Sequence, residues 1–223
     1  MQTHARAVSG VAALTVGLLV FGLAGPALAS GKAPSSSNLN SLTNSLNKAK
    51  HLTYMATYTS NSGGQTTKVT IAQAPPKSSF TSGSSSVINT GSKTYVCSAD
   101  SGTTSCVSTG SANPLAGLEE LFSPAAAVAA FSEAKEGLVS KALGIKTTSS
   151  TQTIAGQPST CVSVSVKGKV AKYCVTKQGL LSYAGTSSSS FQLTKYSSKP
   201  PASAFALPAG ATTVTLPKGV NIP

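Results

Sequence analysis

The residues best placed to do chemistry in this sequence are its four cysteines. Each pair of cysteines lies in a stretch of alternating apolar and polar residues, typical of half-buried β-strands, with a glycine midway between the two. A tight turn at that glycine places the two cysteines opposite one another, in the closely spaced, non-hydrogen-bonded position that suits a disulfide. We therefore predict the disulfides Cys97–Cys106 and Cys161–Cys174 in preference to the two crossed connectivities.

The turn of the second hairpin has two possible geometries. A two-residue turn at Lys167-Gly168 places Val166 opposite Lys169. Gly168 suits the positive φ of such a turn and Lys167 suits it poorly, so a three-residue loop remains an alternative. In the two-residue register the disulfide lies on the serine side of the strand, and the valines face the interior.

Few other side chains support catalysis or metal binding. After residue 29 the chain holds one histidine, His51, one aspartate, Asp100, and four glutamates between 119 and 136. We expect Asp100 at a hairpin tip and His51 at a helix end, so a Ser-His-Asp triad would not converge. Glu119 and Glu120 diverge on a helix and form no carboxylate pair for glycoside hydrolysis. The cysteine spacings lack a matching histidine for zinc. We expect no catalytic residues, metal or cofactor, and predict that the chain is not an enzyme.

Residues 1–29 have the features of a secretory signal peptide. A charged start precedes an apolar run from about 11 to 24 and a small-residue cleavage site that ends at Ala29. An uncleaved membrane anchor is the alternative, but the run is shorter than the ~20 residues that a membrane span needs. Pro26 stands where a lipoprotein signal has its lipidated cysteine. We expect cleavage near Ala29, no transmembrane anchor, and an extracellular or cell-wall-associated protein, where disulfides persist.

The composition is strongly basic, with a formal net charge of +12 that rests on lysine because Arg6 is the only arginine. Such a charge attracts an anionic envelope polymer or lipid head group. The alternative is that dispersed lysines only keep the protein soluble, and we favour it because no run of lysines is dense. Nucleic acid is not an expected partner of an exported chain without aromatic-basic motifs.

The elements that would position these residues form one predicted domain over 38–210, after a linker at 30–37 and before a C-terminal extension at 211–223. Asn38 begins a predicted helix that runs to about His51. Strands follow to Cys106, two helices begin at Asn113-Pro114 and Ser123-Pro124, and more strands run to Tyr196. The predicted fold is α+β: a curved antiparallel β-sheet of about ten strands, a half-barrel, packed on the N-terminal helix and the central helical insertion.

This pattern resembles the LolA-like superfamily of lipoprotein and lipid carriers, especially its secreted or lipoprotein-type actinobacterial members. The resemblance covers most of the chain after residue 29. It rests on the opening helix followed by TYMATYT, and on INTGSKTYVCSADSGTTSC, TIAGQPSTCVSVSV, YCVTKQGLLSYAG and PASAFALPAG. It implies a half-barrel whose concave face and covering helices enclose an apolar cavity for acyl chains or a lipidated partner, without catalytic residues.

We therefore expect a secreted, monomeric, non-catalytic carrier of a lipid or other apolar ligand in the cell envelope. The residues that would line its cavity are Val69, Ile71, Phe80, Leu118, Phe122, Phe131, Val162, Val164, Val166, Tyr173 and Val175. The alternative is an envelope sensor or structural module with a filled core, which binds another exported protein or an anionic wall polymer. An enzyme is the third and least favoured hypothesis.

Overall fold

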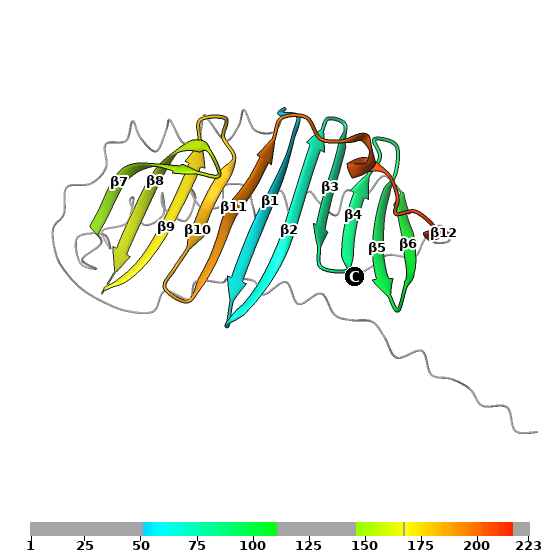
Figure 1. Ribbon diagram of the computed structural model, residues 1–223, viewed down its shortest axis with the longest axis horizontal. Coiled ribbons are helices and arrows are strands. Elements are labelled where there is room, and N and C mark those ends of the chain that lie inside the picture. Colours follow the sequence, from blue (N-terminus) through cyan, green and yellow to red (C-terminus); the bar gives the residue numbers. More distant parts are fainter. Residues whose placement is uncertain (1–50, 111–145, 167, 216–223) are drawn as a thin grey trace, which may run out of the picture.

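The computed structural model describes residues 51–110, 146–166 and 168–215, and these residues form one twelve-stranded, curved open sheet. A single short 3-10 helix, η1, accompanies the sheet (Figure 1). The elements are β1 (Tyr54–Ser62), β2 (Gln65–Ala74), β3 (Lys77–Ser82), β4 (Ser85–Asn89), β5 (Thr94–Asp100), β6 (Thr103–Gly110), β7 (Lys146–Ile154), β8 (Gln157–Val166), β9 (Lys169–Thr176), β10 (Leu181–Gly185), β11 (Ser189–Ser197), η1 (Ala202–Phe205) and β12 (Thr212–Thr215).

Two antiparallel meanders build the sheet, and they join in its middle. The spatial order is β12-β6-β5-β4-β3-β2-β1-β11-β10-β9-β8-β7, so the first strand pairs with the eleventh. In Figure 1 the cyan β1 lies beside the orange β11. A register shift between Thr57 and Tyr58 interrupts this central pair. Segments far apart in the sequence therefore share the central core of the sheet.

The hairpins that carry the cysteines have the predicted register. Cys97 lies opposite Cys106, and Cys161 lies opposite Cys174. At the first turn, Ser101 and Gly102 have φ values of 47° and 83°, the left-handed conformation that a two-residue hairpin turn requires. At the second, β8 ends at Val166 and β9 begins at Lys169, directly opposite. The connection is therefore the two-residue turn, and the three-residue alternative is wrong.

The C-terminal segment crosses the sheet and ends on its far edge. After β11 the chain forms η1, which lies against β3 and buries Phe205. Leu207 and Ala211 then pack against Ile88, Cys97 and Cys106. Thr212–Thr215 finally form β12, the only parallel neighbour in the described sheet, beside β6. This strand lies within the predicted extension at 211–223, whose residues 216–223 lie outside the described part.

The predicted α+β class is wrong for the described residues, which are nearly all sheet, and the sheet has twelve strands rather than about ten. The α+β prediction rested on amphipathic patterns at 38–51 and 113–144. Apart from His51, which lies in a turn, both segments fall outside the described residues, as do the predicted signal peptide and linker. Helical spacing of apolar residues is only a local signal. The fold class of the described residues is that of the strands that occupy nearly all of them.

Candidate functional site

The described cavity candidates all lie on one face of the sheet, which we call the candidate face. Residues directly opposite on neighbouring strands point to the same side of a sheet. Ile71 and Phe80 share a row with Ala56 of β1. On the other half of the sheet, Val162 and Tyr173 share a row with Ala184, Phe191 and Ser60. Ser60 is in β1, four residues after Ala56, so it lies on the same side of the sheet as Ala56. Val69, Val164 and Val175 follow by alternation along their strands.

Packing divides these candidates into two groups. Val69 is buried in the largest cluster with Tyr54, Ala56, Tyr58 and Leu193, and Ile71 and Phe80 pack against that cluster while half-buried. Val162 and Val175 form a separate buried pair with Val164 beside them. The structure thus brings the candidates to one face without joining them in one packed cluster. Leu118, Phe122 and Phe131, and the side chain of Val166, lie outside the described part.

A stacked aromatic pair occupies the candidate face where the two meanders join. The rings of Tyr58 on β1 and Phe191 on β11 have centroids 4.4 Å apart and an interplanar angle of 16°. Burial raises the pKa of Tyr58 above its ordinary value, and Tyr54 raises it further. Burial also raises the pKa of Tyr173. These hydroxyl groups therefore stay protonated at neutral pH, and the aromatic part of the face carries no charge.

Sequence reasoning missed several residues that extend the candidate face. Val87, Val96, Val107 and Val214 continue the row of Ile71 and Phe80 across β4, β5, β6 and β12. The first three are half-buried, and Val214 is 48% exposed. The pairing that places Cys97 opposite Cys106 also places Val96 opposite Val107, so this part of the row could have been predicted from the sequence. The contacts among Tyr58, Phe191 and Leu193 could not have been predicted, because these residues meet only through the β1–β11 pair.

Both disulfides lie on the opposite face, which we call the disulfide face. Cys97 shares a row with Thr57 through β4, β3 and β2, and Cys174 shares one with Thr59 through Tyr183 and Gln192. The bonds are Cys97–Cys106 and Cys161–Cys174, with Cα atoms 4.0 and 3.9 Å apart, and all four cysteines are buried. This confirms the predicted pairing and indicates an exported protein, since disulfides persist in oxidising compartments.

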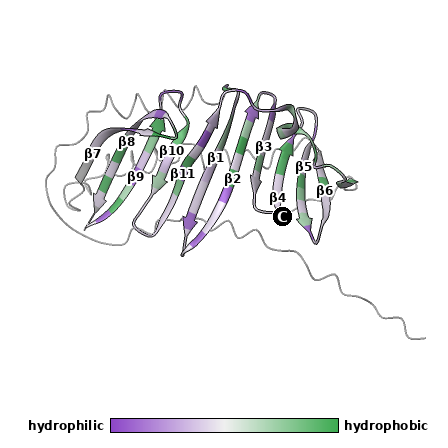
Figure 2. Cartoon of the chain, in the orientation of Figure 1, coloured by the Kyte–Doolittle hydropathy of each residue, from purple (hydrophilic) through white to green (hydrophobic). Residues whose placement is uncertain are grey.

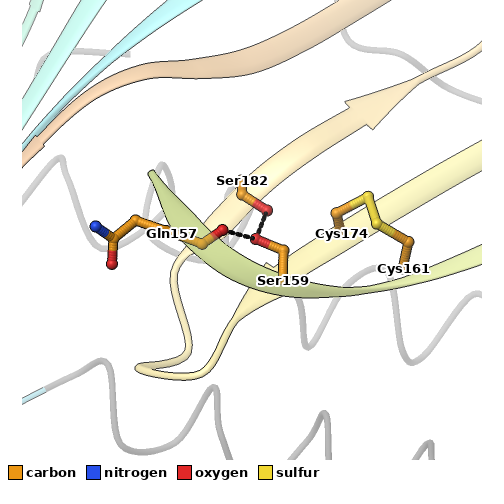
Figure 3. The surroundings of a disulfide bond; sticks show 5 residues. All are labelled: Gln157, Ser159, Cys161, Cys174 and Ser182. Atoms are coloured by element: carbon orange, nitrogen blue, oxygen red, sulfur yellow. Dashed lines mark hydrogen bonds between the residues drawn. A yellow bond between two sulfur atoms is a disulfide. The ribbon is translucent and has the colours of Figure 1, made fainter. Parts of the chain in front are cut away.

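A buried polar chain accompanies the second disulfide (Figure 3). The Ser182 hydroxyl donates to the Ser159 hydroxyl at 2.8 Å, and Ser159 donates to the carbonyl of Gln157 at 3.1 Å. Ser182 lies in β10 where the register shifts between Leu181 and Tyr183. At this shift the alternation of faces is interrupted, and the largest cluster includes Cys161 and Cys174 alongside Tyr58. The hydrogen bonds satisfy polar groups that would otherwise destabilise the buried strand.

The remaining chemistry of the described residues is sparse. Their only histidine and carboxylate side chains are His51, just before β1, and Asp100, at the β5–β6 turn, and both are exposed. Within residues 51–110, 146–166 and 168–215, no group of three His, Cys, Asp or Glu side chains gathers as metal ligands would. The same residues hold no helix that is long and apolar enough to span a membrane. The described arrangement offers contact surfaces rather than a reactive cluster.

Comparison with known proteins gives a likeness of fold. No protein-family model matches the sequence, and no curated protein matches it. Among solved structures, MucB is similar over 80% of this chain, with 14% identity and a TM-score of 0.51. The alignment covers 66% of the MucB chain, so this chain spans just under two thirds of the length of MucB. MucB in the Pseudomonas aeruginosa MucA/MucB complex aligns with 80% of this chain and 64% of its own, at 14% identity and a TM-score of 0.49. The Mycobacterium tuberculosis lipoprotein LppX aligns with 74% of this chain and 95% of its own, at 15% identity and a TM-score of 0.37.

The likeness to MucB concerns the fold alone, since the identity is only 14%. MucB is a LolA-like fold member, and the resemblance seen in the sequence is confirmed at this level. The described residues form a LolA-like sheet.

Proposed function

We propose that this chain is an exported, non-catalytic binding protein that carries a lipid or another apolar ligand on the candidate face. One observation carries the proposal: an unbroken cross-strand row of apolar side chains runs from Ala56 on β1 to Val214 on β12. Most of its members are only half-buried. An acyl chain laid along this row would remove apolar surface from water, which is worth about 25 cal/mol for each Å².

The polar surroundings of the row support an amphiphilic ligand. On the same face, the neighbouring row carries Ser82, Ser85, Ser98 and Ser105 on β3 to β6. Binding sites for small apolar ligands combine a mainly apolar lining with a few polar groups that fix orientation. Hydroxyl groups beside the valines could contact the head group of a lipid whose chain lies on the apolar row.

A second candidate is the capture of another exported protein. The solved structures of MucB include one of its complex with MucA, so this fold accommodates a protein partner in that case. An extended segment with apolar side chains would use the same row of valines. Both proposals include export of this chain, directed by a signal peptide that ends near Ala29.

The non-catalytic part of the proposal is supported by the positions of the titratable residues. Among the described residues, His51 and Asp100 lie on separate elements and are exposed. General acid–base catalysis needs such groups within hydrogen-bond reach of one another or of a substrate.

A fluorescent fatty acid tests the proposal on the purified protein. Val87→Asp places a charge in the middle of the apolar row, and Thr81→Asp places the same charge on an exposed site of the disulfide face. Burying an uncompensated carboxylate against an acyl chain is costly, so we expect Val87→Asp to weaken binding roughly tenfold or more and Thr81→Asp to leave it within about twofold.

The two variants separate ligand binding from folding. Equal thermal midpoints, measured by circular dichroism, establish that both are folded. No saturable binding by the parent protein, or equal loss in both variants, would contradict lipid carriage on this face. Displacement of the fatty acid by an exported host protein, but not by host lipids, would favour the second candidate.

A further inference from the structure

The middle of the disulfide face carries lysines that the sequence shows only as scattered. Lys68 of β2, Lys195 of β11 and Lys172 of β9 lie on the same side of the sheet as Thr57 and Thr59. Lys68 and Lys195 are exposed, and Lys172 is half-buried. Successive members of this series are two strands apart, about 10 Å across the sheet. They also differ in height along the strands, because Lys195 is level with Thr57 and Lys172 is level with Asn61. We call the surface of β2, β1, β11, β10 and β9 around these lysines the basic face.

The side chains between the lysines are polar and accessible. Gln192 and Asn61 are exposed, and Thr59 and Ser190 are half-buried. Hydrogen bonds order part of this surface: Thr66 Oγ1 donates to Asn61 Oδ1 at 2.6 Å, and Asn61 Nδ2 donates to Ser190 Oγ at 3.4 Å. In Figure 2 the most hydrophilic stretches lie on β1, β2 and β11, in the middle of the sheet.

An aromatic side chain lies among these polar groups. The phenol end of Tyr183 covers Gly185, where an added Cβ would approach Tyr183 Oη to 2.6 Å. Lys172 Nζ lies 5.7 Å from the centroid of the same ring. The absence of a side chain at Gly185 thus lets the tyrosine lie close to the strands. A ring held in this way offers an apolar surface beside a cation.

Charge complementarity defines the partner. The only carboxylate side chain of the described residues is that of Asp100, at the β5–β6 turn outside the basic face. The whole chain has a formal net charge of +12. Among the described residues, no carboxylate side chain lies on the basic face to neutralise its lysines. A surface of this kind attracts polyanions over distances of about 10 Å at moderate salt.

We propose that the basic face binds an acidic polysaccharide, a glycan that bears carboxylates on its sugar units. Lysines match its carboxylates, the Asn, Gln, Ser and Thr groups both donate to and accept from sugar hydroxyls, and the Tyr183 ring contacts a sugar ring. A membrane surface fits less well, because Val170 of β9, which is 46% exposed, is the one strongly exposed large aliphatic side chain on this side of the described sheet. The site is separate from the candidate face, so it anchors the protein to the envelope independently of any apolar ligand.

Binding to polygalacturonate tests this proposal, with full-length protein and isothermal titration calorimetry. The site variant replaces Lys68, Lys172 and Lys195 by Gln. The control variant replaces three lysines that lie outside the basic face, Lys93, Lys177 and Lys199, by Gln and so removes the same total charge. We expect the site variant to bind roughly tenfold or more weakly and the control to bind within about threefold of the parent. Tyr183→Ala should also weaken binding.

Three outcomes would overturn the proposal. Equal losses in the two triple variants would mean that net charge alone attracts the glycan. Polyglutamate binding as tightly as polygalacturonate would remove the contribution of the sugar. No binding by the parent protein at low salt would exclude the site. Equal thermal midpoints for the parent and the variants exclude unfolding as the cause of a loss, and fatty-acid binding in the site variant should stay unchanged.

Discussion

At the scale of single residues, Tyr58 shows how the sheet shapes the chemistry of its side chains. It stacks on Phe191 across the β1–β11 pair and is 3% exposed. Burial raises its pKa because an ionised phenol would lose its hydration in the core. The residue therefore stabilises the fold only while it is protonated, which links stability to pH in the alkaline range.

We predict that stability falls above pH 10 in a way that depends on Tyr58. In the unfolded chain Tyr58 ionises near the ordinary tyrosine pKa of 10.0, and in the native state it keeps its proton to higher pH. Its contribution is present in full below pH 10 and is lost as the pH rises above that value. Urea unfolding at pH 8 and pH 11 should show a smaller loss in Tyr58→Phe, which keeps the stacked ring. An equal loss in both proteins would show that Tyr58 does not couple stability to pH.

At the scale of elements, hairpins could be predicted and distant pairs could not. A glycine turn fixes the register of two adjacent strands, so the alternation around Cys97 and Cys161 was enough to predict both disulfides. The pairing of β1 with β11 and of β12 with β6 has no connecting turn to fix its register. The PASAFALPAG tail was part of the resemblance, but its position over β3 and the first disulfide follows only from the structure.

The C-terminal segment should contribute to stability through Phe205. This side chain is 9% exposed in η1, which lies against β3. Phe205→Ala removes a buried ring, and we expect it to lower the free energy of unfolding by roughly 3 kcal/mol. Val214→Ala, at an exposed site of β12, should cost less than about 1 kcal/mol. Urea unfolding with the disulfides intact gives both values, and similar costs would argue against a structural role for η1.

At the scale of the whole molecule, the sheet separates two surfaces of different character. The candidate face carries the apolar row, and the other face carries both disulfides and the side chains of Lys68, Lys172 and Lys195. Such a division follows from the period of two in strand side chains, extended over the twelve strands of one sheet. The predicted α+β class is wrong for the described residues, because the helical patterns that suggested it lie at 38–51 and 113–144, almost wholly outside them.

The candidate site could be predicted in part. Alternation along single strands identified Val69, Ile71 and Val162, and the register places them on one face. Their relation to one another depends on the β1–β11 pair, which joins residues more than a hundred positions apart. No local pattern in a single sequence specifies such a contact, because its register is chosen by packing of the assembled sheet.

The proposed carriage of an apolar ligand is tested most directly by native mass spectrometry of the protein secreted by its own host. We expect a bound lipid or other apolar molecule that adds a discrete mass to the chain. It should be lost in Val87→Asp and retained in Thr81→Asp. A parent protein that carries no added mass, and that takes up no lipid when mixed with an extract of its host's envelope, would contradict the proposed function.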